Sequence, residues 1–126
     1  FPGFSLGDRR RFVRDAAGFL RGSHDAGVYH ADLKASNLLV RDTGERAEFL
    51  LVDLASVNLG RPPGRLKRLR NFAQLHASVP RAATWTDRLR FLRAYHLNGQ
   101  SRPDERRDVT RIGRLTSRRS CNWSLP

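Results

Sequence analysis

The sequence predicts an α+β domain that is mainly helical and carries one short β-hairpin. Three segments, 8–25, 65–78 and 85–97, repeat apolar side chains at the three- and four-residue spacing of amphipathic helices. Two short apolar runs, 38–40 and 49–52, flank a polar stretch that contains a glycine, which is typical of antiparallel strands joined by a turn. At 126 residues the chain is long enough to bury one core.

The first helix is expected over residues 8–25, where the apolar positions are Phe12, Val13, Ala16, Phe19 and Leu20. Asp8 is a candidate N-cap because its side chain can accept hydrogen bonds from the first turn. Gly27 follows the helix, and Val28 and Tyr29 predict a short strand that leads into a polar loop.

The hairpin is the element that organises the candidate site. Two antiparallel strands bring the residue before the first strand close to the residue after the second. Asn37 precedes the run 38–40 and Asp53 follows the run 49–52, so the two side chains are expected at the same end of the hairpin.

Two further helices are expected after the segment Gly60–Gly64, whose two prolines exclude regular structure. Residues 65–78 would bury Leu66, Leu69, Phe72, Ala73 and Leu75. Thr84 and Asp87 have the spacing of a capping box for the helix 85–97, whose buried candidates are Leu89, Phe91, Leu92 and Tyr95. Residues 1–97 are therefore expected to form the domain, and 98–126 a basic, poorly ordered tail or the start of another helix.

The net charge of +12 is unevenly distributed. Residues 1–60 hold eight basic and eight acidic side chains, whereas 61–126 hold sixteen basic and four acidic ones, so the second half carries the whole charge. This asymmetry suits an anionic partner such as a phosphorylated glycolipid, an acidic membrane face or a nucleic acid. Candidate contacts for an anionic substrate are Arg61, Arg65 and Arg68.

Composition excludes several classes of site. Cys121 is the single cysteine, so there is no internal disulfide framework, and no zinc-ligand spacing is present. No apolar run approaches the length of a membrane span and no export leader is visible, so we expect a soluble, intracellular domain. Because the chain contains no methionine, we expect it to be a piece of a longer protein.

The strongest functional signal is the pattern H-x-D-L-x-x-x-N formed by His30, Asp32 and Asn37, with Asp53 sixteen positions after the asparagine. Phosphoryl transfer needs a carboxylate near the acceptor hydroxyl and oxygen ligands for Mg²⁺. Asp32 is the candidate catalytic base, Asn37 and Asp53 are the candidate metal ligands, and Lys34 is placed to contact the transferred phosphate.

Each of these residues also has a structural interpretation, as a turn carboxylate, a loop cap or a solvated lysine, but their joint order favours a site. His30 is expected to play a supporting role by packing beneath the loop and hydrogen-bonding to backbone near Asp53. His24, His76 and His96 are interpreted as ordinary surface or helix residues.

The segments His30–Val40 and Leu51–Ala55 resemble the catalytic loop and the metal-binding strand end of the lipopolysaccharide kinase family. That family has a protein-kinase-like fold and phosphorylates Kdo or heptose in the inner core of Gram-negative bacteria. Residues 65–75 and 87–95 resemble its two following helices, so the resemblance covers about 8–97.

The resemblance implies a C-terminal kinase lobe, with the catalytic loop at 28–40 and the metal-binding strand end at 49–55. It further implies ATP and Mg²⁺ as cofactors and a lipopolysaccharide core or lipid A–Kdo acceptor, in a cytoplasmic protein peripheral to the anionic inner-membrane face. The glycine-rich loop, strand lysine and glutamate of an N-terminal lobe are absent from the sequence, so this chain alone is not expected to turn over ATP.

Two other functions remain open at this stage. Small-molecule phosphotransferases of the aminoglycoside or choline kinase type usually place glycine before the base and tryptophan after the second aspartate, where this chain has Ala31 and Leu54. A basic nucleic-acid-binding module or a pseudokinase is the other alternative, but the aromatics are spaced as helix core residues and no nucleic-acid motif is present. The sugar, its hydroxyl and the oligomeric state are left open.

Overall fold

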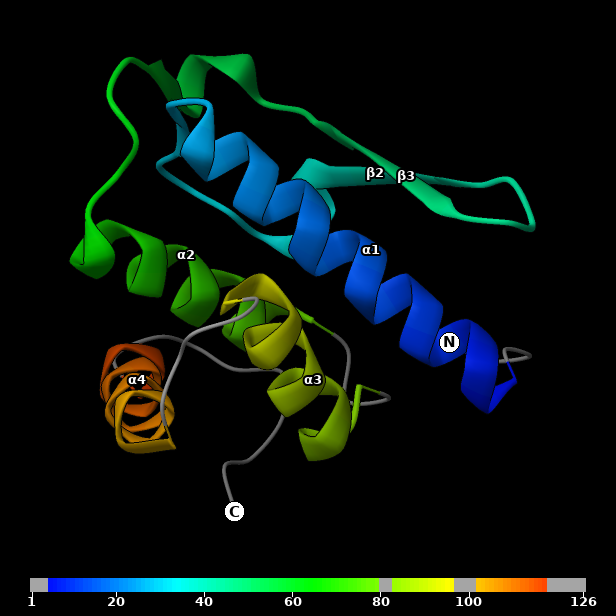
Figure 1. Ribbon diagram of the computed structural model, residues 1–126. Helices are drawn as coiled ribbons and strands as arrows, with labels where there is room; N and C mark the ends of the chain where they lie inside the picture. The colour runs from blue at the N-terminus through cyan, green and yellow to red at the C-terminus, as the bar shows by residue number, and fades with distance from the viewer. Residues whose placement is uncertain (1–4, 80–82, 97–101, 118–126) are drawn as a thin grey trace.

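The computed structural model describes residues 5–79, 83–96 and 102–117. Within these residues the helices are α1 (Leu6–Asp25), α2 (Arg65–Ser78), α3 (Trp85–His96) and α4 (Arg102–Thr116). Figure 1 shows α1 between the β2–β3 hairpin on one side and the remaining helices on the other. The structure confirms the predicted mainly helical α+β class with one short hairpin next to the candidate site.

The described strands form two separate antiparallel pairs. The hairpin consists of β2 (Leu38–Asp42) and β3 (Ala47–Leu51), with Leu38 opposite Leu51. Short 3₁₀ turns occupy Ala35–Asn37, directly before β2, and Leu54–Ser56, shortly after β3. The hairpin therefore lies where the sequence places it. β2 continues two residues beyond the predicted run 38–40, and β3 starts two residues before the predicted run 49–52 and ends one residue before its end.

The second pair was not foreseen from the sequence. β1 (Val28–His30) pairs with β4 (Val57–Leu59), a run too short and too exposed to stand out as a strand. Gly27 precedes this ribbon with φ of 84°, and a Cβ there would lie 1.9 Å from the carbonyl oxygen of Gly60. Only glycine allows the two backbones to approach this closely. The ribbon thereby fixes the start of the catalytic loop beside the segment that follows Asp53.

The caps of two helices illustrate what local sequence determines. Asp8 was predicted as the N-cap of α1, but the cap is Ser5, and Asp8 is the N3 residue of a reciprocal capping box. The prediction was wrong because the apolar periodicity begins only one turn inside the helix. For α3, the predicted box is present, since Thr84 N–H donates to Asp87 and Asp87 N–H donates to Thr84 Oγ1.

The core is formed by side chains from all four helices and the catalytic loop. Its buried members are Ala17, Leu20, Leu33, Leu69, Phe72, Ala73, Leu92, Tyr95 and Ile112. Phe72 and Tyr95 pack edge to face with ring centroids 4.5 Å apart. Leu33, in the middle of the candidate catalytic loop, is fully buried, so the loop is fixed to the core at this residue.

The core also corrects the expectation for the end of the chain. Residues 102–116 form α4, and Ile112 joins the common core, so a poorly ordered tail does not describe this part. The alternative expectation of a further helix is the one that matches. The isolated Ile112 and Leu115 gave too weak a periodicity to predict it, because the other positions of this face are polar. Residues 97–101 and 118–126 lie outside the described residues.

No helix among the described residues has the length and apolar character required to cross a membrane.

Candidate active site

The loop between β1 and β2 starts at His30, whose side chain is 2% exposed. Its Nε2 lies 2.9 Å from the carbonyl oxygen of Val52, and its Nδ1 accepts a hydrogen bond from the backbone N–H of Asp32 at 3.1 Å. Because one partner is an acceptor and the other a donor, the ring is held as the neutral Nε2–H tautomer. His30 thus joins the loop to the residue that precedes Asp53, the backbone contact expected from the sequence.

Asp32, Lys34 and Asn37 are brought together within this loop. Asn37 donates its side-chain amide to the carbonyl oxygen of Asp32 at 2.8 Å, which closes the loop across five residues. Lys34 Nζ lies 3.3 Å from Asp32 Oδ2. The Asp32 side chain is 41% exposed, so its carboxylate is accessible to a bound molecule. A carboxylate and an ammonium group consequently share one accessible position.

Asp53 follows the second hairpin strand, and the ladder aligns it with the loop. The backbone N–H of Val52 donates to the carbonyl oxygen of Asn37 at 2.9 Å, so Asn37 and Asp53 lie at the same end of the hairpin, as the sequence predicts. Asp53 has φ of 63° and ψ of 62° and is the non-glycine residue with positive φ among those described. At Asp53 the backbone therefore no longer follows the strand, in which side chains point alternately to its two faces. The Asp53 side chain is exposed.

The unusual conformation of Asp53 is held by two hydrogen bonds from Ser56. Ser56 donates its backbone N–H to the carbonyl oxygen of Asp53 and its hydroxyl to Asp53 Oδ2, each at 3.0 Å. Aspartate tolerates the left-handed region better than bulky residues do, but the conformation still costs about 1 kcal/mol or more. Such strain is typical of residues whose position matters more than their local stability.

A stripe of polar side chains on α2 holds the catalytic loop from below, and sequence reasoning missed it. Asn71 Nδ2 donates to the carbonyl oxygen of His30, and Ser78 Oγ accepts from the backbone N–H of Ala35, both at 2.8 Å. Between them, Gln74 Nε2 donates to the carbonyl oxygen of Ala31 at 2.7 Å and Gln74 Oε1 accepts from Leu33 N–H at 3.2 Å.

Gln74 therefore clamps the peptide groups on both sides of Asp32. Asn71, Gln74 and Ser78 have the spacing of one helical face, which was the available sequence signal. The prediction for this helix considered only its apolar face, so the polar face was missed.

The oxygen atoms at this end of the hairpin are suitable ligands for a divalent cation. The amide nitrogen of Asn37 is used by Asp32, which leaves Oδ1 as its ligating atom, and Asp53 contributes an exposed carboxylate. No group of three or more His, Cys, Asp or Glu side chains with metal-binding geometry occurs within the described ranges. Mg²⁺ needs no such cage, because it commonly combines one or two protein oxygens with phosphates and water. The residues present thus fit a nucleotide-bound Mg²⁺.

The sequence model of the lipopolysaccharide kinase (Kdo/WaaP) family matches residues 5–95. The chain belongs to the lipopolysaccharide kinase family. A solved structure, WaaP in complex with acyl carrier protein, matches 87% of the chain with a TM-score of 0.74 and 23% sequence identity. This likeness confirms the kinase-like fold, and the chain spans about half of that WaaP chain, 48%. No curated protein sequence matches the chain significantly.

The polar stripe on α2 is continued by a network of hydrogen bonds that runs from Asn71 through the buried interior to Arg68. Asn71 Oδ1 lies 2.8 Å from His24 Nε2, His24 Nδ1 lies 2.6 Å from the Tyr95 hydroxyl, and Arg68 donates to that hydroxyl at 2.9 Å. The partners require Tyr95 to donate to His24 and His24 to donate to Asn71. The chain of donors therefore runs in one direction, from Arg68 to the carbonyl oxygen of His30.

The interpretation of His24 as an ordinary surface or helix residue was wrong. His24 is fully buried, and this burial lowers its pKa, which suits the neutral ring that the network requires. His76 is partly buried, and burial together with the Arg88 guanidinium lowers its pKa to about 4. Burial also lowers the pKa of His96, although the nearby Asp108 carboxylate opposes this effect.

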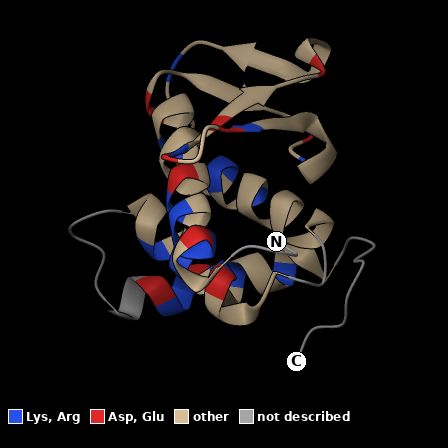
Figure 2. Cartoon of the chain, turned by 90° about the vertical axis from the view of Figure 1, so that its right-hand side faces the viewer, with Lys and Arg blue, Asp and Glu red and all other residues tan. Residues whose placement is uncertain are grey.

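The three arginines predicted to contact an anionic substrate have different surroundings. Arg68 is engaged inside the fold by Asp25, Tyr95 and the carbonyl oxygen of Pro63. Arg65 forms an ion pair with Asp108 on α4, and Arg61 is exposed in the loop before α2. In Figure 2 the Lys and Arg positions, coloured blue, lie mostly on the helices, and the strands carry few of them. The structure thus does not gather these three arginines around Asp32.

Proposed function

We propose that the full-length protein transfers the γ-phosphoryl group of ATP to a sugar hydroxyl, of Kdo or heptose, in the inner core of lipopolysaccharide. The proposal is supported by membership of the lipopolysaccharide kinase family and by the local geometry. The observation that carries it is the closed loop in which Asn37 binds the backbone of Asp32 while Lys34 pairs with its carboxylate. This arrangement provides a base, a cation and a metal ligand on one rigid support.

Asp32 would accept or orient the proton of the attacking sugar hydroxyl, a contribution of about 10²–10⁴ in rate for a general base. Lys34 lies within reach of the same carboxylate oxygen, so a phosphate approaching that hydroxyl would also meet its ammonium group. The buried His30 would hold the loop and transfer no proton, because both of its ring nitrogens are already hydrogen-bonded.

Asn37 and Asp53 would hold Mg²⁺, which when bound offsets the negative charge of the ATP phosphates. The left-handed backbone of Asp53 and its hydrogen bond from Ser56 would keep its carboxylate presented to the nucleotide rather than turned along the strand. Val52 and Asn37, joined by the first ladder bond, would keep the two ligands in register.

The outer face of the hairpin would support the nucleotide base. Leu39 and Leu50 are directly opposite in the ladder and are 54% and 67% exposed, one position further from the site than the pair Leu38 and Leu51. A flat apolar surface next to Asn37 suits an adenine ring, whose burial would cover both leucines.

The acceptor would be the anionic lipopolysaccharide core or lipid A–Kdo, reached by a cytoplasmic protein bound peripherally to the inner membrane. The concentration of the net charge of +12 in residues 61–126 supports this arrangement. Nucleic acid is a less suitable partner, because no binding motif for it is present.

The test is transfer of labelled phosphate from ATP to purified inner-core lipopolysaccharide by the full-length protein. Asp32→Asn and Asp53→Asn should each lower transfer by at least about 100-fold, as expected for loss of a base or of a metal ligand. Glu45→Gln, in the exposed turn at the far end of the hairpin, is the matched control and should keep wild-type activity. ATP consumption without transfer to this acceptor would overturn the substrate, and activity retained by Asp32→Asn would overturn the catalytic assignment.

A further inference from the structure

A second concave site lies between α2 and α4, away from the catalytic loop. The two helices enclose a cavity of about 620 Å³, lined by Arg65, Leu66, Leu69, Arg106, Arg107, Asp108, Thr110, Arg111 and Arg114. The α2 residues of this set and the stripe formed by Asn71, Gln74 and Ser78 occupy opposite faces of the helix, given its 3.6-residue repeat. The cavity is therefore separated from Asp32 by the thickness of α2.

The lining is strongly basic. It contains five arginines and one aspartate, which gives a net formal charge of +4. Asp108 is only 2% exposed, and it is already paired with Arg65, while His96 Nε2 lies 3.1 Å from its other oxygen. Within the described residues, Arg111 and Arg114 have no carboxylate partner. The lining thus carries an excess of positive charge.

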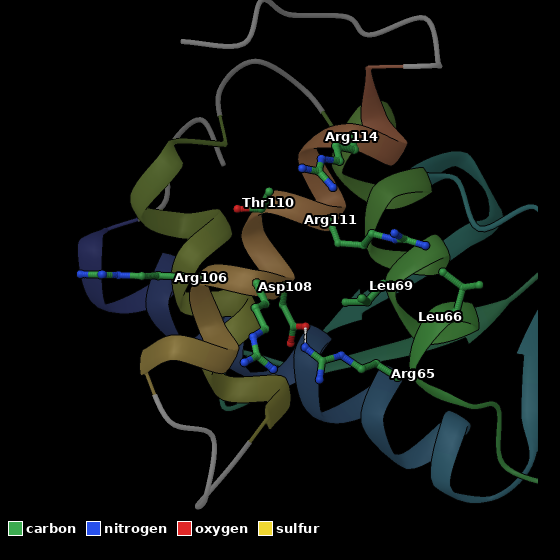
Figure 3. Close-up of a pocket in the computed structure, with 9 residues that line it drawn as sticks. Arg65, Leu66, Leu69, Arg106, Asp108, Thr110, Arg111 and Arg114 are labelled. Atoms are coloured by element: carbon green, nitrogen blue, oxygen red, sulfur yellow. Dashed lines mark hydrogen bonds and ion pairs between the residues drawn. The ribbon is translucent and has the colours of Figure 1, made fainter.

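Figure 3 shows how the side chains are arranged around the cavity. Arg111 extends from α4 toward Leu66 and Leu69 on α2, and Arg65 reaches across from α2 to Asp108. Arg106 points away from α2, so it contributes less to the enclosed part. The Arg111 guanidinium group therefore lies next to an apolar wall, in which Leu66 remains 42% exposed.

This combination selects a particular kind of ligand. Planar guanidinium groups bind phosphate oxygens through paired hydrogen bonds, whereas exposed leucine surface favours hydrocarbon. A phosphate attached to a lipid satisfies both. Single-stranded nucleic acid usually requires aromatic side chains on which its bases stack, and none of the described residues that line this cavity is aromatic.

We propose that the α2–α4 cleft binds the phosphate headgroups of anionic membrane lipids and thereby orients the kinase on the membrane surface. This inference rests on the membrane association proposed above and not on phosphoryl transfer at Asp32. Arg111 and Arg114 contact the phosphate, and Leu66 contacts the adjoining hydrocarbon.

The experiment measures sedimentation of the full-length protein with phosphatidylcholine vesicles that contain phosphatidic acid. A basic residue near an anionic surface contributes about 1 kcal/mol, or about fivefold in affinity, so Arg111→Gln with Arg114→Gln should weaken binding about 25-fold. The matched control is Arg10→Gln with Arg14→Gln, which removes the same charge from exposed positions of α1 and should weaken binding by less than about threefold. An equal loss in both double variants would overturn the site in favour of general charge attraction.

Three further arms make the outcome specific. Inorganic phosphate should compete only weakly with the vesicles for binding to the protein. If it displaces the vesicles completely, and the protein binds them no more tightly than free phosphate, the cleft is assigned to free phosphate instead. An oligonucleotide that binds as tightly and depends equally on Arg111 would overturn the lipid in favour of nucleic acid. The Asp32→Asn protein should bind vesicles like wild type, so failure of the kinase proposal and failure of the docking proposal are read separately.

Discussion

Replacing Gln74 by leucine tests whether α2 positions Asp32, the proposed catalytic base. The substitution preserves approximate size but removes the donor to the carbonyl oxygen of Ala31 and the oxygen that accepts from both Leu33 N–H and Asn71 Nδ2. Leu33 is fully buried, so water cannot replace the lost acceptor of its N–H. Leaving this N–H without a partner costs about 1–3 kcal/mol. Ala31 is exposed and can be rehydrated, which limits its cost to about 0.5–1.5 kcal/mol. We therefore expect Gln74→Leu to destabilise the loop by about 1.5–4.5 kcal/mol.

Amide hydrogen exchange in the full-length protein measures this effect at the atom concerned. A loss of about 2 kcal/mol should speed exchange of the Leu33 amide by roughly 30-fold, because 1.4 kcal/mol corresponds to tenfold. The amide of Ala35, which Ser78 holds independently, should change much less. With Asp32 less well positioned, kcat should fall by about 10- to 100-fold while the KM for ATP changes little.

Leu69→Ala is the matched control, because Leu69 lies on the same helix in the core and its replacement should cost a comparable 2–5 kcal/mol without removing a hydrogen bond to the loop. If Leu69→Ala lowers kcat as much as Gln74→Leu does, the loss reflects general stability. Unchanged exchange of the Leu33 amide in Gln74→Leu would refute the reasoning directly.

Three other predictions follow from the backbone and from burial. Asp53→Gly should be about 1 kcal/mol more stable than Asp53→Ala in chemical denaturation, because only glycine relieves a φ of 63°, while both variants lose kinase activity; equal stability would contradict the strain. Gly27→Ala should cost about 3 kcal/mol because its Cβ would meet the Gly60 carbonyl, whereas Gly44→Ala, with φ of 87° but open space, should cost only about 1 kcal/mol. NMR titration should give His76 a pKa of about 4; since this lies below the unfolded value, His76 should make stability fall as pH decreases from about 6.5 to 4, and His76→Gln should reduce that slope.

Asn71 connects the loop to the buried hydrogen-bond network, and this connection explains why polar groups are buried in the small core. His30 is the first residue of the loop. Its carbonyl group faces away from β4, since hydrogen bonds between the two segments are made by Gly27 and Ala31 and alternate residues of an antiparallel pair point outward. That carbonyl group needs a partner from elsewhere, and Asn71 provides it. A side chain on α2 thus satisfies this loop carbonyl group, which the ribbon leaves without a strand partner.

Local sequence determined the elements and the chemistry of the site. Periodicity placed α2 at the same bounds as the structure, the Thr84–Asp87 spacing gave the cap of α3, and the hairpin pattern put Asn37 and Asp53 at one end. These features depend on neighbours within a few residues, or on one turn, and are therefore readable from the chain alone. The motif itself indicated the lipopolysaccharide kinase family, which the family match confirms.

Tertiary structure decided the features that depend on partners far apart in the sequence. The pairing of β4 with β1, the burial of His24 and the attachment of α4 through Ile112 each join segments separated by tens of residues. In the sequence, Gln74 resembles any polar helix residue. Its partner Leu33 lies 41 positions earlier, and only folding brings the two together. A buried polar side chain is stable only where it finds hydrogen-bond partners, and those partners exist only once the chain has folded.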